Sequence, residues 1–318
     1  MIELGYALSS EEHSPKNLIH NARRAEETGF TFALISDHYH PWTNNQGHSP
    51  FVWAVIGGIA QATERLKLGT GVTCPTMRIH PAIVAQAAAT AECLMPGRFF
   101  LGVGTGENLN EHILGDRWPP HTIRLDMLIE AIELMRELWT GETISWWGDY
   151  YVVEDARIYS LPDKPPPIMI AGSGSKSIAA AGKIGDGFIG LTPKKETIDK
   201  FVAAGGQDKP RYGQLSVCWA ESEAEARHIV YKIWPTGGLK GEMSQELRTV
   251  AHFEQAVKML KEEDVVGEMI CGPDALKHIE GIQQFIDAGY DHIYIHQIGP
   301  DQEGFFRFYA QEVLPAFR

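Results

Sequence analysis

Residues 32–42 read Phe32-Ala33-Leu34-Ile35-Ser36-Asp37-His38-Tyr39-His40-Pro41-Trp42. The first four residues form an apolar run with the length and composition of a short buried strand. Asp37, His38 and Trp42 are then expected just beyond the carboxyl end of that strand. Because α/β enzymes keep their chemistry at such strand ends, this part of the chain predicts an α/β fold with a functional site here.

The composition narrows the class of protein. The chain has 318 residues, of which 44% are hydrophobic, which is ample for one large core. The net charge of −13 argues against nucleic acid and anionic membranes as partners, because both attract a basic surface. The N-terminus lacks the basic and apolar regions of a signal peptide. We therefore expect a cytoplasmic protein with reduced cysteines.

Short apolar runs alternate with helical stretches along the whole chain. The expected strands are 4–8, 32–36, 66–72, 99–104, 168–171, 187–191, 215–220 and 292–297, and the clearest helices are 15–28, 50–63, 81–94 and 124–139. Residues 144–153 suggest an inserted hairpin, and residues 233–272 suggest a helical excursion without a clear strand.

Eight strands with intervening helices predict a (β/α)8 TIM barrel with insertion segments over its C-terminal mouth, in a single domain over residues 1–318. A doubly wound sheet is the alternative. It is weakened because no strand is followed by a full dinucleotide fingerprint. Gly102 and Gly104 supply the first two glycines of that pattern, but Glu107 occupies the place of the third.

In a barrel, the polar segments that follow the strands share one mouth. Asp37, His38 and Trp42 would meet residues 70–73, 104–111 and 172–175 there. The Gly/Ser turn at 172–175 precedes a helix, so it suits a phosphate, although an ordinary turn explains the same residues. His38 alone fits a structural histidine as well as a base, and Glu107 alone is more typical of a capping or solvated residue.

His38 and His40 also form a His-x-His pair, which some metal-dependent barrel hydrolases use. Partner ligands are not evident at matching strand ends, and residues two apart on an extended segment share a face in any case. We therefore expect no metal. No Gly-x-Ser-x-Gly elbow occurs, which argues against covalent acyl chemistry.

Taken together, these segments resemble the deazaflavin-dependent branch of the luciferase-like oxidoreductases, near the coenzyme F420-dependent glucose-6-phosphate and secondary-alcohol dehydrogenases. The resemblance covers nearly the whole chain. It is carried by four motifs in order: residues 36–42, Pro81-Ala82-Ile83-Val84-Ala85-Gln86, the run 101–111 that contains Gly102-Val103-Gly104-Thr105-Gly106-Glu107, and Gly185-Asp186-Gly187-Phe188.

This resemblance implies a TIM barrel, a homodimer and coenzyme F420 in the mouth. It implies a non-proline cis peptide at Gly71–Val72. The cofactor-binding residues that it implies are Asp37, Gly71, Val72, Thr73, Thr105, Gly106, Glu107, Asn110, Ala171, Gly172, Ser173 and Gly174.

The resemblance also implies hydride transfer from a carbinol carbon to the deazaflavin ring. His38 would take the hydroxyl proton, and Trp42 would form one side of the substrate pocket. Glu107 would handle the proton at the pyrimidine side of the reduced ring, or stabilise the charge of the ring. Glu11, Trp42 and Lys194 are the implied substrate contacts.

The substrate remains open at this stage among a sugar phosphate, a sugar and a secondary alcohol. Lys194 is cationic, but Ser244, Gln245 and Glu268 stand where the resemblance leads us to expect further phosphate contacts. An acidic residue there would repel a phosphate. An FMN-dependent luciferase-like monooxygenase and a reductase that uses reduced F420 are the alternative functions.

Overall fold

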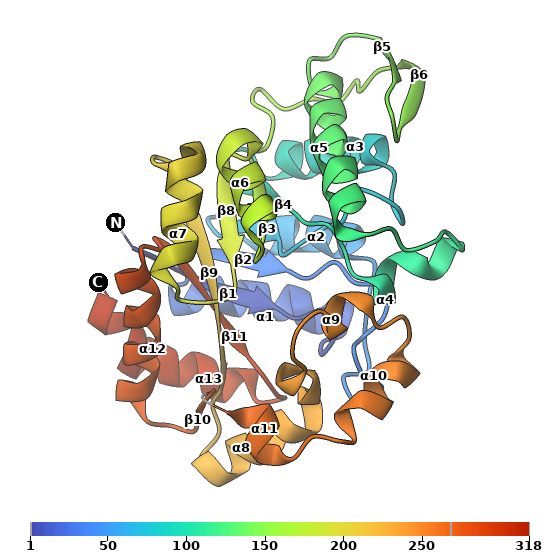
Figure 1. Ribbon diagram of the computed structural model, residues 1–318. Helices are drawn as coiled ribbons and strands as arrows, with labels where there is room; N and C mark the ends of the chain where they lie inside the picture. The colour runs from blue at the N-terminus through green and yellow to red at the C-terminus, as the bar shows by residue number, and fades with distance from the viewer. Residues whose placement is uncertain (1, 268, 318) are drawn as a thin grey trace.

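Parallel strands close into an eight-stranded barrel in the computed structural model, which describes residues 2–267 and 269–317 (Figure 1). The barrel strands are β1 (Glu3–Leu8), β2 (Phe32–Ile35), β3 (Lys67–Thr70), β4 (Phe99–Val103), β7 (Ile168–Ala171), β8 (Gly187–Gly190), β9 (Arg211–Cys218) and β11 (His292–Gln297). Each strand pairs with the next, β9 pairs with β8, and β11 joins β9 to β1. The predicted TIM barrel is therefore confirmed.

Helices pack around the outside of this barrel (Figure 1). They are α1 (Pro15–Thr28), α2 (Val52–Ala62), α3 (Pro81–Leu94), α5 (His121–Leu138), α6 (Ser175–Ile184), α7 (Lys195–Phe201), α8 (Glu223–Ile233), α12 (Ala275–Ala288) and α13 (Gln302–Phe308). The ends of α1 show how the sequence sets these limits. Ser14 caps its first turn by accepting from the Asn17 N–H, and Gly29 ends it with φ 109°. No helix of the described residues has the length and apolarity needed to cross a bilayer.

Both faces of the barrel strands are buried, which explains the uninterrupted apolar run at residues 32–35. Phe32 and Leu34 point into the barrel interior, whereas Ala33 and Ile35 pack against the surrounding helices. Gly69 on β3 makes room for an interior ring, because a Cβ there would lie 2.1 Å from Phe100. Parallel strands covered on both sides are expected to read as continuous apolar runs rather than as an alternating pattern.

Two insertions interrupt the repeat. The predicted hairpin is confirmed as β5 (Ile144–Trp147) and β6 (Val152–Ala156), which pair antiparallel. The excursion contains a 3-10 helix (Pro235–Gly238), α9 (Met243–Glu246), α10 (Val250–Val257) and α11 (Glu262–Val266). The expectation that it lacks a strand was wrong at its end, because β10 (Ile270–Cys271) pairs with β9. Strand seven also begins four residues earlier than expected, at Arg211.

The excursion is fixed against the short helix α4 (Asn108–Glu111), which follows β4 (Figure 1). The Asn108 amide donates to the Glu246 carbonyl at 3.0 Å. The Glu246 carboxylate accepts from the Trp118 indole at 3.2 Å and pairs with the buried Arg124 at 3.3 Å. These contacts hold α9 beside the loop that follows β4.

Candidate active site

A cavity of about 470 Å³ lies at the carboxyl ends of the barrel strands. Most of the expected site residues line it: Glu11, Asp37, His38, Trp42, Gly71, Val72, Thr105, Gly106, Glu107, Asn110, Ala171, Gly172 and Ser173. Residues that follow different strands therefore do share one mouth, as the strand-end argument requires.

His38 lies between two carboxylates. Its Nδ1 is 3.0 Å from Glu11 Oε1, and its Nε2 is 3.3 Å from Glu107 Oε2. The Glu11 carboxylate also accepts a hydrogen bond of 2.7 Å from the Ser36 hydroxyl. Residues that follow β1, β2 and β4 thus converge on one imidazole, which is 12% exposed.

This arrangement sets the charge states of the three groups. Burial lowers the pKa of His38, but the negative charges of Glu11 and Glu107 outweigh burial and raise it to about 9. Burial tends to raise the pKa of Glu11, yet the neighbouring His38 charge and hydrogen bonds hold it at about 2. Burial and the nearby Glu11 charge raise the pKa of Glu107 to about 7. The free site therefore holds a protonated imidazole at neutral pH, beside one carboxyl group that titrates near neutrality.

Asn110 joins the loop after β2 to the loop after β4. Its amide oxygen accepts from the backbone N–H groups of Tyr39 and His40, at 2.9 and 3.1 Å, and its amide nitrogen donates to Glu107 at 3.2 Å. One side chain thereby positions both His38, through its own loop, and Glu107. Trp42 lies edge-on to the His38 ring with 5.2 Å between ring centres.

Asp37 lies in a buried ion-pair network at the edge of the cavity. Its carboxylate accepts from the Thr73 hydroxyl at 2.8 Å and pairs with Arg78 at 2.9 Å. Arg78 also lies 3.5 Å from Glu111. Thr73 is fully buried and does not line the cavity. These two expected cofactor residues therefore fix the loop after β3, with their polar atoms already partnered.

The wall formed by β3, β4 and β7 consists mainly of glycine and small residues. The predicted cis peptide at Gly71–Val72 is confirmed. A Cβ on Gly104 would lie 2.8 Å from Val72, and Gly106 has φ +77° with Cys74 and Glu111 close by. Gly172 lies against α6, where a Cβ would be 2.7 Å from Ser177. Side chains at Gly104, Gly106 and Gly172 would thus collide with neighbouring residues, and these glycines line the cavity with backbone atoms alone.

His40 lies apart from His38. Its Nδ1 is 3.0 Å from the Leu109 carbonyl, and its ring stacks on His112 with 5.9 Å between centres. The alternation that predicted a shared face therefore does not hold, because the chain is no longer extended after β2. Within residues 2–267 and 269–317, no group of three or more His, Cys, Asp or Glu residues has an arrangement that suits a metal ion.

Comparison with known proteins shows the family of this chain. The family model described as luciferase-like monooxygenase matches residues 1–292. The F420-dependent glucose-6-phosphate dehydrogenase of Beutenbergia cavernae is 36% identical, with 100% of this chain and 98% of the relative covered. This chain belongs to the luciferase-like family. The dehydrogenase of the same name from Intrasporangium calvum is 35% identical, with 100% of this chain and 99% of that relative covered.

Solved structures of luciferase-like proteins agree with this fold. An F420-dependent secondary alcohol dehydrogenase, solved in complex with an F420-acetone adduct, superposes with a TM-score of 0.92 at 28% identity, covering 100% of this chain and 99% of that one. The coenzyme F420-dependent tetrahydromethanopterin reductase from Methanopyrus kandleri gives 0.79 at 20% identity, over 100% and 99% of the two chains. At 20% identity, the similarity to the second structure supports the fold alone.

In this luciferase-like chain, some of the expected binding residues lie elsewhere. Lys194 is exposed at the N-cap of α7 and does not line the cavity, and Gly174 caps α6 without lining it either. Ser244 and Gln245 do line the cavity. Glu268 lies outside the described residues.

Five further residues that line the cavity were not predicted from the sequence. Gln214 and Ser216 on β9, His296 on β11, and Trp234 and Thr236 in the excursion all line the cavity. The alternation of polar and apolar residues within β9 was the available signal, since residues two apart on a strand share a face. The strand was expected to begin only at 215, so that signal was not used.

Proposed function

We propose that this protein is a coenzyme F420-dependent dehydrogenase that oxidises the CH–OH group of a small molecule, a sugar phosphate, a sugar or a secondary alcohol. The observation that carries the proposal is His38, held between Glu11 and Glu107 beside Trp42 and opposite a wall of bare backbone. The names of the curated relatives and of the solved alcohol dehydrogenase support the same cofactor and reaction.

The cavity fits a planar cofactor. Gly104 and Gly106 line the cavity and have no side chain, so the wall after β4 admits a flat ring close to the backbone. Gly172 and Ser173 precede α6, whose first N–H groups suit the cofactor's phosphate. We propose that the wall of residues 71–72, 104–106 and 171–174 holds F420, while Asp37, Thr73 and Asn110 keep its loops in place.

When bound, F420 supplies a ring that accepts a hydride and reacts poorly with oxygen. A neutral His38 would accept the hydroxyl proton of the substrate carbinol, whose hydride would leave to the acceptor that F420 supplies, so that a carbonyl product would form. Glu11 orients the His38 ring and stabilises the positive charge that the imidazole carries once it has taken the proton. Glu107, whose pKa is raised to about 7, is able to exchange a proton at neutral pH. Trp42 bounds the side where the carbinol lies.

The test is an anaerobic titration of the purified protein with oxidised F420, followed by a panel of secondary alcohols, sugars and sugar phosphates. Substrate-dependent bleaching of the deazaflavin absorbance supports the proposal. Binding of FMN but not of F420 would instead favour the monooxygenase function. Oxidation of reduced F420 by carbonyl compounds, with no bleaching by any alcohol, would favour the reductase direction.

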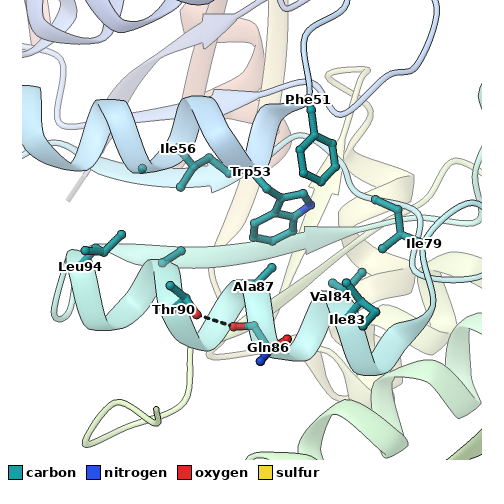
Figure 2. Close-up of a pocket in the computed structure, with 12 residues that line it drawn as sticks. Phe51, Trp53, Ile56, Ile79, Ile83, Val84, Gln86, Ala87, Thr90 and Leu94 are labelled. Carbon is teal, nitrogen blue, oxygen red and sulfur yellow. Dashed lines mark hydrogen bonds between the residues drawn. The ribbon is translucent and has the colours of Figure 1, made fainter. Parts of the chain in front are cut away.

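We also propose that the protein is a homodimer. Figure 2 shows an apolar groove between α2 and α3, with Phe51, Ile56 and Ile83 along it, and its volume is about 310 Å³. Phe51 is 60% exposed and Ile83 is 56% exposed, and exposed apolar clusters of this kind mark association surfaces.

Sedimentation velocity tests the dimer. Ile83→Glu is expected to yield a monomer, because it would bury a charge in an apolar contact. Leu276→Glu is the control, since Leu276 is 68% exposed on α12, away from the groove. A monomeric unmodified protein, or equal effects of both substitutions, would contradict the proposal.

A further inference from the structure

In the described chain, the only cation placed in the cavity is the His38 imidazolium, and it is already paired with Glu11 and Glu107. Among the described residues that line the cavity, none is Lys or Arg, whereas Glu11, Asp37, Glu107 and Glu111 contribute carboxyl groups. Asp37 and Glu111 are already paired with Arg78 behind the wall. A substrate phosphate would enter a site whose net charge repels it.

The nearby lysines do not correct this balance. Lys194 is exposed on the outside of the mouth, and its backbone N–H bonds to Thr192 at 2.8 Å. Lys232 at the end of α8 and Lys240 in the excursion are both exposed and absent from the cavity wall. Cations that remain in bulk water contribute little to binding inside a cavity, because solvent screens them.

Hydroxyl and amide groups, together with the imidazole of His296, line another side of the cavity. Ser216 lies directly beside His296 in the β9–β11 register, and Gln214 lies beside Tyr294 one step away on the same face. Thr236 completes this wall from the excursion, and its hydroxyl has no partner among the described residues. We call Gln214, Ser216, Thr236 and His296 the polar wall. Such groups recognise hydroxyls rather than charges.

His296 is the most firmly held member of the polar wall. Its Nε2 lies 3.0 Å from the carboxylate of Glu12, which is buried and also accepts from the Gly299 N–H at 3.0 Å. Trp234 packs edge-on to its ring at 4.6 Å. Because the carboxylate accepts, a neutral imidazole carries its proton on Nε2 and leaves Nδ1 as an acceptor. That Nδ1 has no partner within the described chain.

We propose that the substrate is an uncharged polyhydroxylated alcohol, such as a polyol or free sugar, and that His296 selects it by binding a hydroxyl distant from the reacting carbinol. This inference rests on the proposed function for the position of that carbinol beside His38. Glu12 acts as a positioning residue that fixes the imidazole tautomer. Trp42 and Trp234 supply flat apolar surface for the carbon skeleton between its hydroxyls.

The test compares sorbitol, D-glucose, glucose 6-phosphate and 2-propanol with the F420-loaded protein, by calorimetric titration and by steady-state kinetics. We expect kcat/KM for the better of sorbitol and glucose to exceed that for glucose 6-phosphate and for 2-propanol by about tenfold or more. Preference for glucose 6-phosphate over glucose would overturn the inference, as would failure of both sorbitol and glucose to bind.

Substitutions assign the selectivity to the polar wall. His296→Asn is expected to raise KM for the polyol about tenfold while changing kcat and the KM for 2-propanol by less than about threefold. Thr236→Val keeps the shape without the hydroxyl and should act in the same direction, since no internal bond is lost. His20→Asn is the matched control, because His20 also lies 3.0 Å from a glutamate but on the exposed surface.

The two proposals fail in different ways. If sorbitol binds and His296→Asn weakens that binding, but no alcohol bleaches F420, the dehydrogenase proposal fails and the substrate class stands. If alcohols bleach F420 but His296→Asn raises the KM of sorbitol and 2-propanol equally, the polar wall does not select hydroxyls and this inference is wrong. An unchanged F420 dissociation constant in His296→Asn, measured by absorbance titration, separates substrate recognition from cofactor loss.

Discussion

The two halves of the barrel mouth differ in what they present to the cavity. The half formed by β9, β11, β1 and β2 presents side chains with hydrogen-bonding or acid–base chemistry, including Ser216, His296, Glu11 and His38. The half formed by β3, β4, β7 and β8 presents backbone and small residues, including Gly71, Gly104 and Gly172, with apolar Ile189 and Leu191 at β8. In the function that we propose, the first half would act on the substrate and the second would hold the flat ring of the cofactor.

This division follows from simple geometric requirements. A planar ring bound at van der Waals distance needs a wall without side chains, so glycine is favoured there. Recognition and proton transfer need long polar side chains held in fixed orientations, and those come from the ends of neighbouring strands whose residues pair by register. Glu107 and Asn110 connect the halves, because they follow β4 yet contact His38 and its loop.

The largest effect is expected from a substitution in the half formed by β9, β11, β1 and β2, which carries the acid–base side chains. His38→Ala should lower kcat for alcohol oxidation about 10²- to 10⁴-fold, the usual contribution of a positioned base. F420 affinity should change little, because we propose that the other half of the mouth holds the ring. His40→Ala is the control, since His40 lies two residues away but contacts the Leu109 carbonyl. Single-turnover bleaching of F420 measures the rate, and a similar loss in both variants would mean that the loop, and not the imidazole, is responsible.

A smaller effect is expected from disturbing the glycine half. Gly106→Ala places a Cβ 2.5 Å from the Cys74 sulfur at a φ of +77°, so the loop after β4 must move. We expect F420 affinity to fall about 10- to 100-fold, because a displaced loop would no longer match the ring and single substitutions of this kind cost about 1–3 kcal/mol.

Gly115→Ala is the control that separates the strain of a positive φ from displacement of the loop by a steric clash. Gly115 has a comparable φ of +92°, but a Cβ there would meet nothing within 4 Å. Both variants should lose thermal stability through the left-handed backbone, Gly106→Ala more because of its added clash, while only Gly106→Ala should weaken cofactor binding in an absorbance titration. Full F420 affinity in Gly106→Ala would break the proposed role of this wall.

The sequence was sufficient for the features that follow from local pattern. The apolar run 32–35 predicted β2, and the strand-end rule placed Asp37, His38 and Trp42 in one mouth with residues 104–107. The resemblance added the cis peptide at Gly71–Val72, which no local pattern indicates.

The remaining features depend on contacts between distant segments. Glu11 lines the cavity, and its expected contact with a substrate stays a prediction. Its pairing with His38, 27 residues later in the chain, was not predicted, because only the β1–β2 register brings it about. Lys194 was assigned by charge and approximate position, and an irregular turn after β8 carries it outward. The excursion has no repeating period that would show which of its residues face inward, so Trp234 and Thr236 were missed.

The smallest expected effect of a substitution is a shift of the pH profile in Glu107→Gln, since Glu107 contacts His38 from the opposite half of the mouth. Oxidation needs a neutral His38, whose pKa is raised to about 9 by Glu11 and Glu107 against the effect of burial. The kcat/KM for the alcohol should therefore rise about tenfold per pH unit and level off above about pH 9. Carbonyl reduction needs the protonated imidazole, so its kcat/KM should fall above about pH 9.

Glu107→Gln removes one of the two negative charges beside His38, which lowers the pKa of that imidazole. The pH at which oxidation levels off and the pH at which reduction begins to fall should both decrease. Glu312→Gln, an exposed carboxylate far along the chain, should leave them unchanged. If kcat/KM instead changes near the ordinary histidine pKa, and Glu107→Gln does not move that transition, then the charge of Glu107 does not set the pKa of His38.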